Sequence, residues 1–274
     1  MEGNPWWHWP SFFEKHNMTR VSGHTLIASP CCQSIFKTVV YASLNMSAMG
    51  YWTDGAQEHG LAPTDGGLRL CRCGTAFLLR DAIQLGTKAD PDTEFTDKPT
   101  DAQLPAIIQT PPSPRVEVTA RRNYWRYLND QYREQYRAHR EIEDARAHDE
   151  WRRDYYASLP LPQRALRKLL RSNPKPDFPR ATRPFTVPPF HPTARQSENM
   201  ACLLALILAG AEMPIKANAL DNGLEIAELH RELGNFDAAA QALHTVSEDR
   251  EEVTKQVING QILERCAAPI RYRM

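Results

Sequence analysis

Proline divides this chain more sharply than any other residue type. A proline removes a backbone hydrogen-bond donor and disfavours helix in the residue before it, so dense proline predicts segments between domains. We therefore expect linkers at residues 88–115 and 172–195. The first of these contains Pro91, Pro99, Pro105, Pro111, Pro112 and Pro114. The breaks leave a front segment (1–87), a charged middle segment (116–171) and a tail (196–274).

The front segment predicts a small antiparallel β module. Between Thr25 and Tyr51, β-branched and aromatic side chains recur with polar residues between them, which is typical of two short strands. The pair Asp54-Gly55 is a turn signal, and an apolar stretch then leads toward Cys71. The segment is too short for a large sheet, so we expect a β ribbon.

Five aromatic side chains crowd the amino-terminal arm. They are Trp6, Trp7, Trp9, Phe12 and Phe13. A partner-binding arm would have this composition. Leaving so much apolar surface in water is unfavourable, however, so we expect the arm to dock back onto its own domain.

Cysteine supplies the strongest chemical signal in the sequence. Cys31 and Cys32 lie at one end of the predicted ribbon, and Cys71 and Cys73 follow its return strand. Two thiolates on each of two loop tips build a tetrahedral structural zinc site, so we expect these four side chains to bind Zn2+. The spacing is irregular, because zinc knuckles usually place two residues between the ligands of a pair. Side chains of adjacent residues also diverge in an extended chain.

Histidine could complete the site if Cys31 and Cys32 do not both reach one ion. A histidine nitrogen is an ordinary zinc ligand, and His24 lies upstream on the same predicted hairpin, with His59 as a second possibility. Two alternatives remain open. In one, the ribbon has lost its metal and an apolar core replaces it. In the other, Cys31 and Cys32 serve redox chemistry through an exposed thiolate or a strained vicinal disulfide.

Charge and hydropathy limit the partners of the chain. Lys plus Arg equals Asp plus Glu at 33 each, so no global positive field draws the chain onto phosphate backbones or anionic lipid. The start of the sequence lacks the basic and apolar regions of a secretory signal, and the longest apolar run, Met200–Ala211, is too short to cross a bilayer. We expect a soluble, cytoplasmic protein with no membrane partner and with nucleic acid disfavoured as a partner.

The middle segment predicts helix. It contains no proline or glycine from Arg121 to Tyr156, and apolar or aromatic side chains recur there at steps of three or four. These side chains are Tyr124, Trp125, Leu128, Tyr132 and Tyr136. We expect one long helix, or two in series, whose aromatic stripe packs on a neighbour. The alternative is that its interleaved arginines and aromatics bind single-stranded nucleic acid.

The tail predicts an antiparallel stack of helices. Apolar periodicity places them at Ala201–Leu208, Lys216–Leu233 and Phe236–Val246. In the second of these helices, Leu220, Leu224, Ala227 and Leu229 are expected to face inward. A fourth helix is expected to begin at Ser247, a residue type that caps helix amino termini well. Gly234 breaks the second helix from the third.

Short stretches spread along the chain carry a family resemblance. They are Gly50-Tyr51-Trp52-Thr53-Asp54-Gly55, Leu61-Ala62-Pro63, Cys71-Arg72-Cys73-Gly74, the single residues Arg122, Trp125, Asn129 and Arg133, and Arg231-Glu232-Leu233-Gly234-Asn235-Phe236-Asp237-Ala238-Ala239. In these residues the chain resembles uncharacterised bacterial proteins that have an amino-terminal zinc ribbon and a helical carboxy-terminal region related to tetratricopeptide repeats. The resemblance implies no activity.

The resemblance implies particular zinc ligands. In the family pattern each knuckle resembles Cys-Pro-x-Cys, whereas here Ser29 stands at the first ligand place and Leu70 at the third. This leaves Cys32 and Cys73 as the matched ligands. A local shift would let Cys31 and Cys71 take the other two places.

The resemblance also implies one helical hairpin of tetratricopeptide type in the tail. Its residues are Leu233, Gly234, Phe236, Ala239 and Leu243, with the glycine permitting a tight turn. One such unit cannot bury its apolar face alone, so we expect it to stack on the Met200 helix and on a helix at Glu252–Leu263. The predicted fold class is therefore α+β, with a zinc-ribbon-like β module followed by a mainly helical region.

No set of residues makes a compelling catalytic site. Asp54, Glu58 and His59 lie close in sequence and could pair as acid and base, but turns carry such residues for solubility and geometry. We therefore expect an adaptor that binds another protein rather than an enzyme. The alternative is a zinc-bearing nucleic-acid binder that uses the arginine-rich middle helix. That function requires one helix face clear of acids for Arg121, Arg122, Arg126, Arg133 and Arg137.

Overall fold

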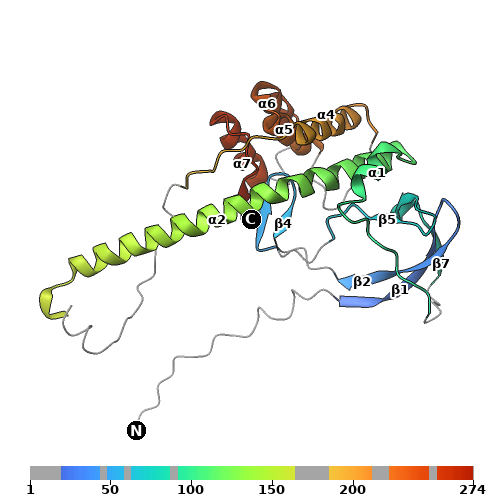
Figure 1. The fold of residues 1–274 in the computed structure, drawn as a ribbon, viewed down its shortest axis with the longest axis horizontal. Coiled ribbons are helices and arrows are strands. Elements are labelled where there is room, and N and C mark those ends of the chain that lie inside the picture. Colours follow the sequence, from blue (N-terminus) through green and yellow to red (C-terminus); the bar gives the residue numbers. More distant parts are fainter. Residues whose placement is uncertain are drawn as a thin grey trace, which may run out of the picture. The chain divides into compact units, whose positions relative to one another are not determined.

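The computed structural model (Figure 1) describes residues 20–43, 48–58, 63–86, 92–163, 185–211, 222–246 and 252–273. The strands are β1 (Arg20–Ala28), β2 (Ile35–Ser43), β3 (Gly50–Trp52), β4 (Gln57–Glu58), β5 (Leu68–Leu70), β6 (Ala76–Leu78), β7 (Ile83–Gly86) and β8 (Arg271–Tyr272). The helices are η1 (Leu79–Asp81, a 3-10 turn), α1 (Leu104–Gln109), α2 (Pro114–Ser158), α4 (Ala194–Leu208), α5 (Asn222–Glu232), α6 (Phe236–His244) and α7 (Glu252–Leu263).

The expected order of an antiparallel β region followed by a mostly helical region is confirmed. Contacts divide the chain into two compact units. The first unit combines Met1–Leu128 with Pro192–Met274, and the second is Asn129–His191.

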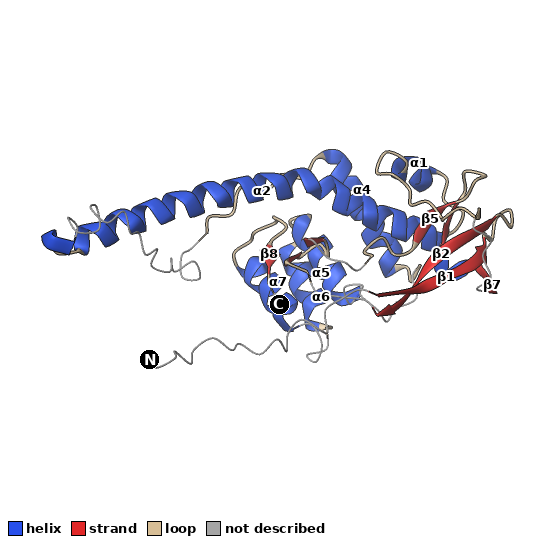
Figure 2. Cartoon of the chain, turned by 90° about the horizontal axis from the view of Figure 1, so that it is seen from below, coloured by secondary structure: helices blue, strands red, loops and turns tan. Residues whose placement is uncertain are grey.

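The largest sheet of the first unit has the strand order β2-β1-β7, with antiparallel pairing throughout (Figure 2). The β1–β2 hairpin begins at Arg20 and ends at Ser43, so both strands are longer than the alternating pattern suggests. Backbone pairing continues outward because it does not depend on apolar side chains. At the closed end of the hairpin, Ile27, Ala28 and Phe36 are buried, and this is the end that carries the cysteines.

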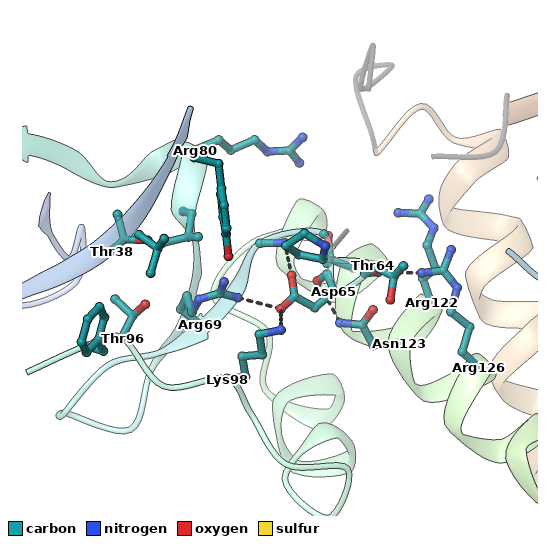
Figure 3. A pocket seen from close by; sticks show the side chains of 18 residues that line it. Thr38, Thr64, Asp65, Arg69, Arg80, Thr96, Lys98, Arg122, Asn123 and Arg126 are labelled. Atoms are coloured by element: carbon teal, nitrogen blue, oxygen red, sulfur yellow. Dashed lines mark hydrogen bonds and ion pairs between the residues drawn. The ribbon is translucent and has the colours of Figure 1, made fainter. Parts of the chain in front are cut away.

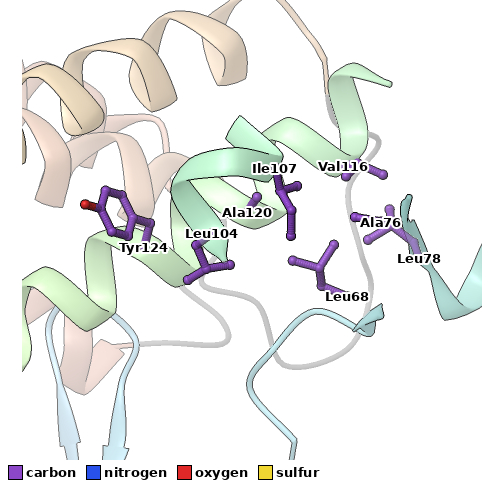
Figure 4. Close-up of a cluster of buried hydrophobic side chains, with 8 residues drawn as sticks. All are labelled: Leu68, Ala76, Leu78, Leu104, Ile107, Val116, Ala120 and Tyr124. Carbon is purple, nitrogen blue, oxygen red and sulfur yellow. The ribbon is translucent and has the colours of Figure 1, made fainter. Parts of the chain in front are cut away.

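A buried apolar cluster fixes the second hairpin, β5–β6, to two helices (Figure 4). The cluster consists of Leu68, Ala76, Leu78, Leu104, Ile107, Val116, Ala120 and Tyr124. A fully buried Val, Leu or Ile side chain contributes about 1.5–3 kcal/mol relative to an exposed one. The hairpin tip with Cys71 is therefore held on a rigid base.

Helix occupies part of the segment in which we expected only linker. Helix α1 and the first residues of α2 lie within 88–115, and each begins with proline in its first turn. Proline is well tolerated there, because the first amides of a helix have no intrahelical acceptor and the fixed φ suits the helix. The hydroxyl of Ser113 also accepts a hydrogen bond from the Val116 amide at 3.3 Å. Proline density alone did not distinguish a helix start from a linker.

The tail forms the expected stack of helices, with different bounds. Helix α4 begins at Ala194 instead of Ala201, because Thr193 and Gln196 form a reciprocal capping box at its amino terminus. The predicted positions 216–221 and 247–251 lie outside the described residues. Leu224, Ala227 and Leu229 are fully buried, as the periodicity predicts.

Helices α5 and α6 form a hairpin at Gly234, whose φ of 80° lies in the left-handed region that favours glycine. The Gly234 amide donates to the Arg231 carbonyl at 2.9 Å, and the Asn235 amide donates to the His230 carbonyl at 2.8 Å. The hairpin packs against α7 through one apolar cluster. Its buried members are Leu224, Ala227, Ala239, Leu243, Val246, Ile258 and Ile262.

A small third sheet joins strands from distant parts of the sequence. Its order is β4-β3-β8, so the last described strand pairs with a strand of the front region. The Thr53 amide donates to the Ile270 carbonyl at 3.0 Å, and the Ile270 amide donates to the Thr53 hydroxyl at 3.0 Å. Arg271 and Glu58 add an ion pair at 2.6 Å. No local sequence signal marks Arg271–Tyr272 as a strand.

In the second unit, the aromatic stripe of α2 packs on residues 185–190, which lie inside the segment 172–195 that we expected to be linker. The Tyr132 ring centroid lies 4.9 Å from that of Phe190, and the Tyr136 centroid lies 4.8 Å from that of Phe185. The Tyr132 hydroxyl donates to the Pro188 carbonyl at 3.0 Å. The stripe therefore serves packing. Within the described part of the chain, no helix combines the length and apolar character needed to span a membrane.

Candidate metal centre

Two hairpin tips bring the four predicted cysteine ligands together. Cys31 and Cys32 lie in the loop between β1 and β2, and Cys71 and Cys73 lie in the loop between β5 and β6. Their four sulfur atoms all lie within 4.8 Å of one another. All four are free thiols rather than members of a disulfide. Residues about 40 positions apart in sequence therefore form one donor set that could hold a metal ion.

The spacing of the sulfur atoms suits a tetrahedral ion. Cys32 Sγ lies 3.2 Å from Cys71 Sγ, and Cys31 Sγ lies 3.5 Å from Cys73 Sγ. An ion with four sulfur ligands at about 2.3 Å places those sulfurs about 3.8 Å apart. The observed range of 3.2 to 4.8 Å brackets this value, so small side-chain adjustments suffice to close the site.

Adjacent cysteines reach the same point because the first loop turns sharply. The Ser29 amide donates to the Ser34 carbonyl at 3.0 Å, and the Gln33 amide donates to the Ser29 carbonyl at 3.0 Å. Gln33 takes a φ of 58°, which only a tight turn requires. The expectation that Cys31 and Cys32 diverge, as they would in an extended strand, is wrong for this loop.

The second loop is a β-turn built on Gly74. The Gly74 amide donates to the Cys71 carbonyl at 2.8 Å, and the Cys71 amide donates to the Thr75 carbonyl at 2.9 Å. Gly74 has a φ of 84°, a conformation that glycine adopts without the penalty of a Cβ atom. The turn presents both Cys71 and Cys73 to the first loop.

Hydroxyl groups surround the thiols. Ser29, which stands where the resemblance places a ligand, is fully buried and accepts a hydrogen bond from the Cys71 thiol at 3.2 Å. The Ser34 hydroxyl lies 3.0 Å from Cys32 Sγ, and the Thr75 hydroxyl accepts from Cys73 Sγ at 3.4 Å. These hydroxyls can donate to sulfur once a thiolate forms.

The hydrogen bonds separate the acidities of the four thiols. Hydrogen bonds from Ser34 and Cys71 lower the pKa of Cys32 to about 5, and Thr75 lowers the pKa of Cys73. Burial, with hydrogen bonds that the Cys31 thiol donates to Cys71 and Cys73, raises the pKa of Cys31 to about 12. The site therefore favours a mixture of thiolates and thiols without metal. A bound cation would displace the remaining protons.

Neither histidine is needed to complete this set. His24 is exposed, and its ring packs edge-on against Phe95 with centroids 5.1 Å apart. It is not among the residues whose donor atoms converge with the four sulfurs. His59 lies outside the described residues.

A small apolar core supports the two loops from below. Cys71 is itself buried in this core, together with Ile27, Phe36 and Phe77. The Phe36 and Phe77 rings stack with centroids 6.4 Å apart. The cluster is small, so its apolar contacts alone stabilise the module only modestly.

A second polar set, buried in the same unit, was missed as a site by the sequence reasoning. Arg122 donates two hydrogen bonds to Glu225, at 2.6 and 2.8 Å, and the exposed fractions of these residues are only 5% and 1%. Trp125 Nε1 donates to Glu232 at 2.8 Å. Two consecutive turns of α2 are thereby fixed to α5.

Arg231 is the centre of this buried set. It is fully buried and donates to both carboxylate oxygens of Glu228, at 2.8 and 2.5 Å. It also donates to the Cys266 carbonyl and to the Thr53 hydroxyl. Burial would lower the pKa of Arg231, but the charge of Glu228 outweighs it and raises the pKa above its usual value. The Arg231 side chain is therefore charged in the folded protein.

Glu232 differs from its neighbours in this set. Burial, together with the charges of Glu228 and Asp54, raises its pKa well above the usual value for a glutamate. The hydrogen bond from Trp125 opposes this only in part. Thr53, Arg122, Trp125, Arg231 and Glu232 all belong to the stretches that carry the family resemblance, and that was the signal available in the sequence.

Asp54 and Glu58, which the sequence suggested as a possible acid–base set at the β3–β4 turn, both have structural partners. Asp54 is fully buried and accepts a hydrogen bond from the Ala56 amide at 3.0 Å, as a turn residue does. Glu58 pairs with Arg271. These contacts account for the two carboxylates by turn geometry and by the packing of the third sheet.

The five arginines of α2 that the nucleic-acid alternative requires are paired with acids or with the backbone. Arg121 binds Glu117 at 2.8 Å, and Arg122 binds Glu225 as described above. Arg126 donates to the Asp54 and Thr64 carbonyls. In the second unit, Arg133 is buried and binds Asp130 at 2.8 Å, and Arg137 donates to the Arg133 carbonyl. A face of arginines clear of acids, which a nucleic-acid binder would need, is not favoured by these contacts.

Comparison of the chain with protein-family models, with curated proteins and with solved structures gives no match.

Proposed function

We propose that the four thiols form a structural Zn2+ site that closes a zinc-ribbon-like module. The observation that carries this proposal is the convergence of Cys31, Cys32, Cys71 and Cys73 within 4.8 Å. Four thiolates satisfy the tetrahedral preference of zinc and leave no open position for water or substrate. Such a site holds loops together and does not catalyse. Two hairpins with little shared apolar core are the kind of structure that needs it.

Elemental analysis tests the metal. The full chain, purified without added metal, is expected to contain about one zinc per chain. Cys73→Ser is expected to lose it, whereas Cys202→Ser, a distant and partly buried cysteine in α4, is expected to keep it. A metal-free protein that stays folded in the presence of a chelator would sink the proposal. Iron in place of zinc would retain the ligand set and correct the ion.

The protein as a whole acts, in this proposal, as a non-enzymatic adaptor that binds another protein through its helical tail. The α5–α6 hairpin has the tight glycine turn and small packed residues of a tetratricopeptide-type unit, an architecture that presents surfaces to peptides or domains. Large apolar side chains are exposed on the neighbouring helices: Leu208 of α4 is 62% exposed and Leu263 of α7 is 77% exposed. The carboxylates near the β3–β4 turn already have structural partners, which agrees with a role other than catalysis.

Affinity capture from the native cytosol tests this function. The double variant Leu208→Ser/Leu263→Ser is expected to lose the partner recovered by the native chain. Ile142→Ser is the matched control, because Ile142 of α2 is 60% exposed and lies in the second unit. Equal recovery by all three proteins would refute the tail as the contact surface. Recovery of nucleic acid alone would favour the alternative, a zinc-bearing nucleic-acid binder.

A further inference from the structure

The first unit contains a cavity that lies outside the cysteine cluster and outside the helical tail. Its volume is about 530 Å3, within the range of roughly 300–1,000 Å3 typical of small-molecule sites. It is formed by the middle of β2, the loop at Pro63–Gly67 together with Arg69 of β5, the η1 residues Leu79 and Arg80, the extended segment at Phe95–Lys98 and the face of α2 from Thr119 to Arg126 (Figure 3).

Cations outnumber carboxylates in the lining of this cavity. Its charged side chains are Arg69, Arg80, Lys98, Arg122 and Arg126, with Asp65 as the single carboxylate. Glu225 neutralises Arg122 from outside the lining. Asp97 lies between two lining residues but does not line the cavity itself, since alternate side chains of an extended segment point in opposite directions.

Ion pairs and hydrogen bonds do not cancel this excess of positive charge in the lining. Asp65 binds both Arg69, at 3.0 Å, and Lys98, at 2.8 Å, so one carboxylate serves two cations. Arg126 donates to the backbone carbonyls of Asp54 and Thr64, which carry no net charge. Arg80 is exposed and has no hydrogen-bond or ion-pair partner among the described residues. Without Arg122 and Arg126, the lining still holds three cations, Arg69, Arg80 and Lys98, against the one carboxylate of Asp65, a surplus of about two positive charges.

The cavity is built rather than incidental, because its floor is organised by Asp65. Besides the two cations, Asp65 accepts a hydrogen bond from the Gly67 amide at 2.9 Å. Its backbone carbonyl accepts from the Asn123 side chain at 3.0 Å, which fixes the loop to α2. Burial alone would raise the pKa of Asp65, but Lys98 and Arg69 outweigh it and hold the pKa below its usual value. The Asp65 carboxylate thus stays ionised and binds both Arg69 and Lys98.

The remaining lining suits an organic ligand rather than a bare ion. Tyr41 and Phe95 present partly exposed rings, and Val39 and Leu79 add aliphatic surface. Hydroxyl groups come from the threonines, among them Thr38 and Thr96 (Figure 3). Guanidinium groups bind phosphate oxygens through paired hydrogen bonds, and aromatic faces stack on heterocyclic rings.

We propose that this cavity binds a small phosphorylated molecule of nucleotide size, with the phosphate at Arg80 and Lys98 and the ring against Tyr41 and Phe95. The two cations come from η1 and the Phe95–Lys98 segment, so one ligand would contact both elements. The site is independent of the proposed metal centre and of the tail surface. Its failure would leave both of those proposals intact.

Titration calorimetry on the full native chain tests the proposal, with ADP, adenosine, inorganic phosphate and a short single-stranded oligonucleotide as probes. ADP is expected to bind at a Kd below about 1 mM, and more tightly than adenosine or phosphate alone, because it engages both parts of the cavity. Failure of ADP to bind, or phosphate binding as tightly as ADP, would overturn the proposal. Tighter binding of the oligonucleotide through Arg80 and Lys98 would replace the proposed nucleotide site with a nucleic-acid site.

Variants locate the site. Arg80→Gln is expected to weaken ADP about tenfold, the typical value of one charge-assisted hydrogen bond, and adding Lys98→Gln is expected to weaken it further. Arg115→Gln is the matched control, since Arg115 is an exposed cation of α2 that does not line the cavity, and it is expected to change affinity less than twofold. Arg80 makes no contact that folding needs, so its variant keeps the native melting temperature. Native affinity in the Arg80 and Lys98 double variant would overturn the proposal.

Discussion

The cysteine loops and the α5 region bring polar side chains together by opposite means. At the loops, four thiols converge above a small apolar core, and their mutual repulsion as thiolates is relieved only by a cation. Around α5, carboxylates and guanidinium groups neutralise each other directly and lie between two apolar clusters. In the function proposed above, the first region depends on a metal ion from solution, whereas the charges of the second region neutralise each other within the chain.

The largest effect is expected from Cys71→Ser. Cys71 is both a proposed ligand and a buried member of the core beneath the loops, so its loss removes the metal and weakens the packing. We expect the β1–β2 and β5–β6 loops to lose at least about 4 kcal/mol of local stability, a fraction of what zinc contributes to small metal domains. Hydrogen exchange measured residue by residue should show this loss at 29–34 and 71–75, while α5 and α6 keep their protection.

The control for this prediction is Cys202→Ser. Cys202 lies in α4 and is only partly buried, so a smaller hydroxyl there should cost about 1 kcal/mol without any change in metal content. Equal loss of stability in Cys71→Ser and Cys202→Ser would remove the distinction between ligand cysteines and packing cysteines.

A smaller but still large effect is expected from Glu225→Gln. The change leaves the Arg122 guanidinium buried without its carboxylate, and breaking a buried pair in this way typically costs about 3–5 kcal/mol. Chemical denaturation followed by tryptophan fluorescence measures it, since Trp125 lies one helical turn further along α2. Glu117→Gln breaks a more exposed pair with Arg121 and should cost less than about 1 kcal/mol. Equal costs would show that burial does not decide the value of these pairs.

Glu232→Gln is expected to act in the opposite direction. Because the folded-state pKa of Glu232 is raised, the native protein binds a proton that the unfolded chain releases, so its stability falls as pH rises from about 4.5 through the folded pKa. Glutamine does not titrate, and its oxygen can still accept from Trp125. The variant should therefore be about 1 kcal/mol more stable at pH 8 and should lack this part of the pH dependence. Melting temperatures from pH 5 to 8 measure both effects, and a destabilised variant would contradict the raised pKa.

The smallest expected effects are those of two glycines in the helical tail. Gly234→Ala should destabilise the α5–α6 hairpin by about 1 kcal/mol, because φ is 80° there, even though open space surrounds the position. Gly260→Ala lies within α7, also in open space, and should stabilise the protein by about 0.5–1 kcal/mol. Thermal unfolding of the two variants would show opposite shifts. A shift of the same sign would mean that backbone conformation does not govern these positions.

Sequence periodicity predicted the parts of the fold that depend on local pattern. The inward positions Leu224, Ala227 and Leu229 and the aromatic stripe of α2 followed from helical spacing alone, because side-chain burial on a helix repeats with its turn. The cysteine set was also predictable, since thiols have few other reasons to occur in pairs. The approach of the two pairs was not, because it depends on turn conformations at Gln33 and Gly74.

What sequence reasoning missed depends on distant partners. Glu225 and Glu228 look like surface residues of an amphipathic helix, and only the arrival of Arg122 and the rotamer of Arg231 make their burial possible. Charge counts do not reveal such pairing, because acids and bases are equally numerous along the whole chain. The cavity at Asp65 was missed for the same reason, since its lining comes from five separate segments.

The pairing of β3 with β8 has a consequence for synthesis of the protein. Thr53 and Ile270, whose hydrogen bonds lead into this pairing, are 217 residues apart in sequence. At translation rates of about 5–20 residues per second, the front strand waits roughly 10–45 s for its partner to leave the ribosome. During that interval one edge of β3 has open backbone donors and acceptors, the kind of edge that pairs with neighbouring chains. The nascent chain is therefore most vulnerable to aggregation before its last strand emerges, and a chaperone that shields this edge would act at that stage.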